Sequence, residues 1–335
     1  MFRRGQTAVS FKGNIRNVFF GMAQLINDNS QINLPLRDGS DTQLFEMSDH
    51  VLHCPPSYSS TDLFARGNSG FLYRKPHGCR VVKYPPSYAF ADLRNEYNIY
   101  TRLAENGGSD RITQCFGMVE RGIELEFLEG GCLTSVLKGL QYDDEDLEKR
   151  LLWVSQCIEA IRHAHSKNIH CYDVSCNNFV LDGQKNVKAI DFEDAEIMGE
   201  IPLTGFCHAG HSCPPFNEKI RRDIFLLGVI IYQVMTGSLP YQDGDQPTWK
   251  QIKMRYEKGE FSSTSSLPGI GDIIAQCWEG RYQCVEEIET DIKHEKGTTS
   301  QTWKIMSLTL SQQDAKDGKA IFTHSILCNL NTLRW

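Results

Sequence analysis

The stretch HSKNIHCYDVSCNNFVL, residues 165–181, decides how this chain is expected to fold. A helix is predicted just before it, over Leu147 to Ser166, because apolar residues recur there at spacings of three and four. Asp173 precedes Asn178 by five residues, and Asp191 follows Asp173 by eighteen within AIDFE. Two carboxylates and a carboxamide offer hard oxygen ligands for Mg²⁺ and a group that can orient an attacking hydroxyl. Transfer of a phosphoryl group requires such a set.

A pair of glycines and two charged residues lie upstream in a fixed order. ARGNSGFLY, residues 65–73, contains Gly67 and Gly70, whose backbone N–H groups can approach a phosphate closely because no Cβ intervenes. Lys83 ends the run RVVK thirteen residues beyond Gly70, and Glu96 lies thirteen residues further on in a helical pattern. Each signal alone is usually a turn or a solvated charge, so the interpretation depends on their order.

The chain up to residue 129 is typical of a small sheet with one helix. The helix is expected over Asp92 to Leu103, after the third of five strands. Short apolar runs separated by turn residues predict these strands; the runs are Leu63 to Arg66, Phe71 to Arg74, Arg80 to Lys83, Ile112 to Val119 and Ile123 to Leu128. Beyond Gly131 the apolar spacing becomes mainly helical, including a strongly apolar helix over Asp223 to Thr236.

In this order and spacing the motifs resemble those of the protein kinase family. ARGNSGFLY resembles its glycine-rich loop, RVVK its VAIK strand, ELEFLEGG its hinge, CYDVSCNN its catalytic loop and AIDFE its metal-binding DFG segment. The resemblance runs from about residue 62 to 295. It implies an α+β, bilobal protein kinase-like fold, with a small five-stranded antiparallel β lobe carrying one helix and a larger, mainly α-helical lobe.

The resemblance also divides the chain. We expect an N-terminal extension over residues 1–60 and a small lobe over 61–129. The helical lobe is expected over 130–295, and a C-terminal tail of unassigned structure over 296–335.

Roles for individual residues follow from the resemblance. Asp173 is implied as the base, with Lys83 and its ion-pair partner Glu96 as the other catalytic residues. Asn178 and Asp191 are implied as Mg²⁺ ligands, and Asp223 as a buried group that bonds the backbone of the catalytic loop. Contacts with ATP are implied for Gly67, Gly70, Leu72, Val81, Lys83, Glu126, Leu128 and Val180.

The sequence departs from the family pattern at several of these motifs. Tyr172 stands where the family has the Arg before the catalytic Asp, which removes the usual anchor for a phosphorylated activation loop. Ser175 stands where a serine/threonine kinase has Lys, so a positive charge near the transferred phosphate is missing. Glu193 replaces the glycine of DFG, and Ala65 replaces the first glycine of the loop.

Three functions are compatible with these motifs. The favoured one is an ATP- and Mg²⁺-dependent protein kinase acting on a Ser, Thr or Tyr hydroxyl of a protein substrate. A nucleotide-binding pseudokinase with little or no activity is the second. The third is a small-molecule phosphotransferase of the same fold, since IDFED at 190–194 resembles the corresponding run of aminoglycoside and choline kinases.

Composition bounds the remaining classes. The 335 residues are 40% hydrophobic and 23% charged, as in ordinary folded proteins, and the net charge of −7 argues against nucleic acid or anionic membrane as the main partner. The twelve cysteines are scattered without a CxxC pair, and neither a signal peptide nor a spanning segment is recognisable. We therefore expect reduced thiols, no structural metal, and a cytoplasmic or nuclear location. The sequence leaves the oligomeric state open.

Overall fold

The computed structural model describes the two lobes but not the ends of the chain. The described residues are 55, 57–66, 70–85, 93–139, 147–199, 218–242 and 247–297. The expected N-terminal extension falls almost entirely outside them, as do the tail beyond residue 297 and Gly67 of the glycine-rich loop.

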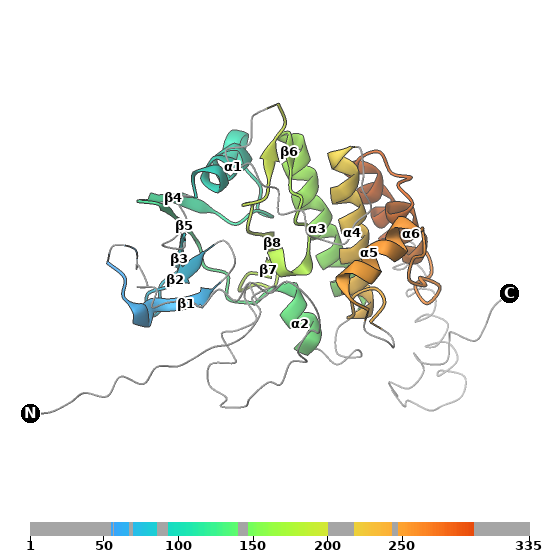
Figure 1. Ribbon diagram of the computed structural model, residues 1–335, viewed down its shortest axis with the longest axis horizontal. Helices are drawn as coiled ribbons and strands as arrows, with labels where there is room; N and C mark the ends of the chain where they lie inside the picture. The colour runs from blue at the N-terminus through green and yellow to red at the C-terminus, as the bar shows by residue number, and fades with distance from the viewer. Residues whose placement is uncertain are drawn as a thin grey trace, which may run out of the picture.

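Five antiparallel strands form the sheet of the small lobe, at the left of Figure 1, as the sequence predicted. The order across the sheet is β1-β2-β3-β5-β4. The helix α1, Arg94–Ala104, follows β3 and packs against β4. The strands are β1 (Leu63–Arg66), β2 (Phe71–Tyr73), β3 (Arg80–Tyr84), β4 (Cys115–Val119) and β5 (Gly122–Glu126).

The register of the sheet gives it two distinct faces. Lys83 of β3 lies opposite Leu72 of β2 on one side and Ile123 of β5 on the other, so these side chains share a face. Val81 and Leu125 pair on that same face, and its apolar residues belong to the main hydrophobic core. The other face carries a separate small cluster of Tyr73, Val82 and Tyr84.

The large lobe is built around two long helices. α3, Leu147–Ser166, and α4, Lys219–Thr236, lie side by side, and α6 packs on the far side of α4 (Figure 1). α4 is buried on most of its circumference, which explains its nearly continuous apolar sequence. The remaining helices are α2 (Leu133–Gly139), α5 (Trp249–Glu257), α6 (Ile270–Trp278) and helical residues 285–297.

Two element boundaries differ from the sequence prediction for a physical reason. α4 begins four residues before the expected Asp223. Three of these four residues are charged and none is fully buried, so they lie outside the apolar pattern. Ile112 was expected in a strand, but β4 begins at Cys115. The apolar side chain of Ile112 is buried because its backbone forms a parallel bridge with Ala189 of the large lobe.

Two short antiparallel strand pairs of the large lobe flank the loop with Asp173 and the segment with Asp191. β6, Ile169–His170, pairs with β9, Glu196–Ile197, and β7, Phe179–Leu181, pairs with β8, Val187–Ala189. The loop with Asp173 lies between β6 and β7, and Asp191 follows β8.

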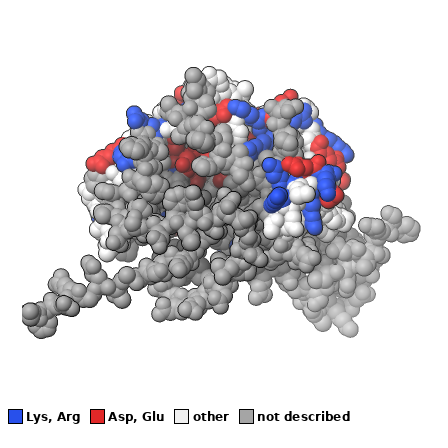
Figure 2. Space-filling model, in the orientation of Figure 1, with Lys and Arg blue, Asp and Glu red and all other residues white. Residues whose placement is uncertain are grey.

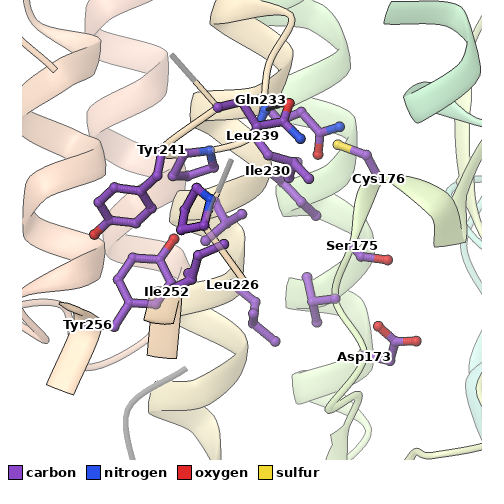
Figure 3. A pocket seen from close by; sticks show the side chains of 15 residues that line it. Asp173, Ser175, Cys176, Leu226, Ile230, Gln233, Leu239, Tyr241, Ile252 and Tyr256 are labelled. Carbon is purple, nitrogen blue, oxygen red and sulfur yellow. Dashed lines mark hydrogen bonds between the residues drawn. The ribbon is translucent and has the colours of Figure 1, made fainter. Parts of the chain in front are cut away.

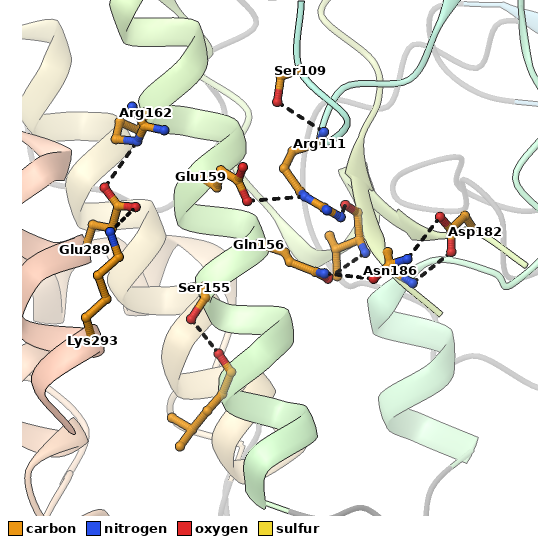
Figure 4. A network of polar contacts seen from close by, with 12 residues as sticks. Ser109, Arg111, Ser155, Gln156, Glu159, Arg162, Asp182, Asn186, Glu289 and Lys293 are labelled. Carbon is orange, nitrogen blue, oxygen red and sulfur yellow. Dashed lines mark hydrogen bonds and ion pairs between the residues drawn. The ribbon is translucent and has the colours of Figure 1, made fainter. Parts of the chain in front are cut away.

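A polar network connects the small lobe to the large one beside the β7–β8 hairpin (Figure 4). The Ala189 N–H donates to Arg111 O over 2.7 Å, and Arg111 forms a 3.2 Å ion pair with Glu159 of α3. Gln156, one turn earlier on α3, accepts from the Val187 N–H and donates to Asn186 Oδ1. These bonds attach the chain before β4 to Ala189, which precedes Asp191 by two residues.

The surface of the described part is mixed in charge. Figure 2 shows Lys and Arg side chains interspersed with Asp and Glu side chains over the helices at the right of the view. Among the described residues, no helix has the length and apolar character needed to cross a membrane.

Gly228 lies at a close contact between α4 and α6 and gives a test of the fold. A Cβ at Gly228 would lie 2.7 Å from Cys277 Cβ and 3.0 Å from the Trp278 ring. We expect Gly228→Ala to lower the free energy of unfolding by about 1–3 kcal/mol, measured by denaturant titration. Gly139→Ala, exposed on α2 with open space around it, is the control and is expected to be neutral or to stabilise by up to about 1 kcal/mol. Equal effects of the two substitutions would contradict the packing described.

Candidate active site

Lys83 joins the two lobes through a pair of carboxylates. Its Nζ donates to Glu96 Oε2 of α1 over 2.7 Å and to Asp191 Oδ1 after β8 over 2.6 Å. The side chains of Lys83 and Glu96 are 3% and 1% exposed, and that of Asp191 is 15% exposed. The structure therefore contains the Lys83–Glu96 ion pair that the sequence predicted. It adds a direct contact between Lys83 and Asp191, which lie 108 residues apart in the sequence.

Negative charge exceeds positive charge in this cluster. Burial opposes the charge of Lys83, but attraction to Asp191 and Glu96 outweighs it and raises the pKa of Lys83 above its ordinary value, so the ammonium persists. Burial raises the pKa of Glu96 to about 7; Lys83 lowers it less than burial raises it, and Asp191 adds to the increase. Glu96 Oε1 is also buried and has no hydrogen-bond partner among the described residues, which agrees with a carboxyl that is costly to ionise.

The loop after β6 is held by its own carboxamide. Asn178 Nδ2 donates to Asp173 O over 3.0 Å, and Asn178 O accepts from the Ile190 N–H. These two bonds leave the amide oxygen of the Asn178 side chain as an acceptor. The bond from Ile190 places Asn178 beside the segment that carries Asp191. The Asp173 carboxylate itself lies at one end of a pocket (Figure 3).

Tyr100 fixes Asp191 from the small lobe. Asp191 has φ +60°, an uncommon conformation for a residue with a Cβ. Its N–H donates to the Tyr100 hydroxyl over 3.2 Å, and the Tyr100 ring meets Phe192 edge to face at 5.2 Å. Tyr100 was not predicted as a site residue, because in the sequence it resembles an ordinary apolar position on α1.

Asp223 anchors the same loop from α4. The residue is fully buried, and its carboxylate accepts hydrogen bonds of 2.9 Å from the N–H groups of Cys171 and Tyr172 and from His165 Nε2. The predicted bonding of Asp223 to the backbone of this loop is confirmed. A fully buried carboxylate is tolerated here because donors surround it.

Four of the residues implied for nucleotide contact fall into two separate buried groups. Leu72 and Val81 are on the Lys83 face of the sheet, whereas Val180 and Leu128 form a separate buried cluster with Cys132 and Ile190. All of these side chains are buried, with exposed fractions of 7% or less.

Gly70 and Glu126, which the resemblance implies as nucleotide contacts, also make contacts that support the fold. A Cβ on Gly70 would lie 2.6 Å from Tyr84 O, so the close approach of β2 and β3 requires a glycine there. The side chain of Glu126 pairs with Lys188 of β8 over 2.8 Å and holds the connection between the lobes. Nothing in the sequence around Lys188 signals this contact.

Tyr172 occupies the position of the absent arginine and makes different contacts. Its hydroxyl donates to Glu196 Oε2 over 3.0 Å, and Glu196 also pairs with Lys219 at the start of α4. The Arg222 guanidinium lies 5.4 Å from the centre of the Tyr172 ring. Burial and Glu196 raise the pKa of Tyr172 to about 12, so the phenol stays neutral and donates.

The sheet lobe and the helical lobe are thus joined by Lys83, which pairs with one carboxylate from each lobe. The family model described as a protein kinase domain matches residues 87–279, which is more than half of the chain. The chain belongs to the protein kinase family.

Curated relatives agree with this family. The chain is 29% identical over 153 residues to CBL-interacting serine/threonine-protein kinase 8 of Arabidopsis thaliana, covering 43% of this chain and 33% of the relative. It is 26% identical over 190 residues to serine/threonine-protein kinase PrkC of Bacillus subtilis, covering 51% of this chain and 28% of the relative. The matched part therefore spans about a third or less of these relatives.

Glu96→Gln tests the excess of negative charge around Lys83. The pKa of Glu96 is about 7 in the folded chain, whereas its ordinary value is 4.5. Between these two pH values the folded state holds a proton on Glu96 that the unfolded state releases. This contribution to stability is complete below pH 4.5 and is lost as the pH rises through 7.

Glutamine does not titrate, so the unfolding free energy of wild type relative to Glu96→Gln should fall with rising pH. We expect a fall of up to about 3 kcal/mol between pH 4.5 and 8, measured by denaturant unfolding. Glu105→Gln, at a more exposed glutamate, serves as the control. A difference that stays constant or increases over this range would contradict the account.

Proposed function

We propose that this chain is a protein kinase that transfers the γ-phosphoryl group of ATP to a hydroxyl of a protein substrate. The observation that carries the proposal is the contact of Lys83 with both Glu96 and Asp191, from separate lobes, beside the loop that holds Asp173 and Asn178. Family membership supports the same reaction class.

Lys83 is proposed as the cation for the α- and β-phosphates of ATP. Its ammonium is fixed by Glu96, and Asp191 competes for it, so negative phosphate oxygens would enter a site that already has a charged donor in place. The adenine is proposed to lie between Leu72 and Val81 on one side and Val180 on the other, with main-chain groups of Glu126 to Leu128 as hydrogen-bond partners. The glycines Gly67 and Gly70 are proposed to cover the phosphates.

The residues present fit a magnesium site. Asp191 supplies carboxylate oxygens, and Asn178 supplies an amide oxygen because its Nδ2 is already bonded to Asp173 O. Both are hard ligands of the kind that Mg²⁺ prefers. A bound Mg²⁺ would supply charge neutralisation of the phosphates.

Asp173 is proposed as the base. Its carboxylate would accept the proton of the substrate hydroxyl as the hydroxyl oxygen bonds to the γ-phosphorus and the bond from that phosphorus to ADP breaks. Ser175 leaves the site without the lysine found in serine/threonine kinases, so we expect turnover roughly a hundredfold below that of a complete site. The relatives are named serine/threonine-protein kinases, which favours Ser or Thr over Tyr as acceptor.

Asp173→Asn tests the proposed base. The substitution removes the proton acceptor with little change in size, so phosphate incorporation from radiolabelled ATP and Mg²⁺ into mixed Ser, Thr and Tyr protein substrates should fall at least a hundredfold. ATP binding should be retained, because Asp173 is not among the residues proposed to hold the nucleotide. Asp272→Asn, exposed on α6, should leave incorporation unchanged.

The outcomes separate the alternatives. Equal incorporation by wild type and Asp173→Asn would refute the assigned base. Nucleotide binding by wild type without transfer to any protein would contradict the proposed activity and indicate a pseudokinase. Transfer to hydroxylated metabolites alone would indicate a small-molecule phosphotransferase.

A further inference from the structure

Two histidines and an aspartate from three separate elements meet where the loop with Asp173 begins. His165 lies near the end of α3, His170 ends β6, and Asp223 lies near the start of α4. One ligand atom of each of these three residues lies within 4.8 Å of those of the other two. His165 Nε2 is 2.9 Å from Asp223 Oδ2, and the two imidazole rings meet edge to face with their centres 5.6 Å apart.

The cluster is buried and contains polar atoms that the described chain does not use. The side chains of His165 and Asp223 are 8% and 0% exposed, and His170 is 7% exposed. The Nδ1 atom of each histidine is buried and has no hydrogen-bond partner among the described residues. A buried nitrogen without a partner costs stability, so such atoms point to a missing ligand. The bonds of Asp223 to the Cys171 and Tyr172 N–H groups account for the carboxylate but not for the two imidazoles.

The charges around the cluster favour a cation. Burial lowers the pKa of His170 below its ordinary value; Asp223 opposes this shift and His165 adds to it. The imidazole of His170 is therefore neutral at pH 7 and keeps a lone pair for a metal ion. Glu196 and Lys219 also act on His170, but they form an ion pair with each other, so their effects largely offset. The carboxylate of Asp223 remains, with two nitrogen ligands beside it.

Two imidazole nitrogens and one carboxylate oxygen form a ligand set typical of Zn²⁺. Zinc sites with three protein ligands hold a water molecule in the fourth position. Mg²⁺ and Ca²⁺ prefer oxygen ligands throughout, so they suit Asn178 and Asp191 better than this cluster. Nitrogen and oxygen ligands about 2.0–2.2 Å from Zn²⁺ stand about 3.3 Å apart, which is close to the His165–Asp223 distance. The ligand atom of His170 would approach by up to about 1.5 Å.

We propose that His165, His170 and Asp223 bind a Zn²⁺ ion, with a water molecule as the fourth ligand. The ion would join α3, β6 and α4 at the point where Asp223 already holds the backbone that leads to Asp173. Its role is structural, because none of its ligands is among the residues proposed to bind ATP, Mg²⁺ or the substrate hydroxyl. The inference is therefore independent of the proposed kinase function.

No short motif signals this site in the sequence, which is why no structural metal was expected. His165 and His170 are five residues apart, across the end of a helix and the turn into a strand. Asp223 lies 58 residues beyond His165. Only the packing of α4 against α3 and β6 brings the three side chains together.

Calorimetric titration of Zn²⁺ into the full chain tests the proposal. The chain is first freed of metal with a chelator and kept reduced, without nucleotide or Mg²⁺. We expect wild type to bind one equivalent at this site with a Kd below about 1 µM. His170→Phe keeps a ring but removes its nitrogens, so the affinity should fall at least about a hundredfold. His294→Phe makes the same change at a side chain that is 77% exposed and should bind like wild type.

Two further measurements separate metal binding from a merely structural role. Co²⁺ in the site should give the visible absorption of a four-coordinate ion without the sulfur-to-metal band that cysteine ligands produce, and His170→Phe should lose this absorption. Without metal, His170→Phe should unfold at the same temperature as wild type or higher, because it removes a buried nitrogen without a partner.

A second variant keeps the proposal testable if His170→Phe does not fold. His165→Gln retains an N–H donor for Asp223 but removes the imidazole, so it should lose Zn²⁺ binding as well.

No binding of Zn²⁺ by wild type, or equal affinities of wild type and His170→Phe, would overturn the inference. Binding that persists in both histidine variants and disappears after alkylation of the thiols would assign the ion to cysteines and would also overturn it. Because the titration contains no ATP, its result does not depend on the proposed phosphoryl transfer.

Discussion

One buried ammonium group, that of Lys83, connects the two lobes. It reaches Glu96 on the helix of the small lobe and Asp191 behind the last strand of the β7–β8 hairpin, with distances of 2.7 and 2.6 Å. A buried ion pair contributes little net stability, because desolvation offsets the attraction. Its role is positional, because it fixes a positive charge and two carboxylates relative to one another. The proposed phosphoryl transfer would depend on that arrangement.

Three further side chains hold the segments around Lys83 in place. Asp223 holds the backbone of the catalytic loop, Asn178 ties the loop to itself, and Tyr100 holds the Asp191 N–H. The chain at Arg111 is bonded to β8 and to α3, and these contacts link the small lobe to the segment that precedes Asp191. The departures at Tyr172 and Ser175 leave these supports in place, because none of the supports uses the side chains that the family would have there.

Sequence reasoning found the elements and the groups with a local signature. Apolar periodicity predicted the five strands and the long helices, and fixed spacings singled out Lys83, Glu96 and Asp191. Contacts that depend on distant pairing gave no such signal. Tyr100 reads as a core residue of a helix, and Lys188 as an ordinary strand charge, until the fold brings them to Asp191 and Glu126. Ile112 was assigned to a strand because a buried bridge has the same apolar character as a strand.

Calorimetric titration of ATP with Mg²⁺ tests the central claim most directly. If Lys83 organises a triphosphate site between the lobes, wild type binds the nucleotide and Lys83→Met binds at least tenfold more weakly. Lys293→Met removes an exposed lysine that pairs with Glu289, and this variant should bind like wild type. Equal affinities of wild type and Lys83→Met, or no binding by wild type, would contradict the account.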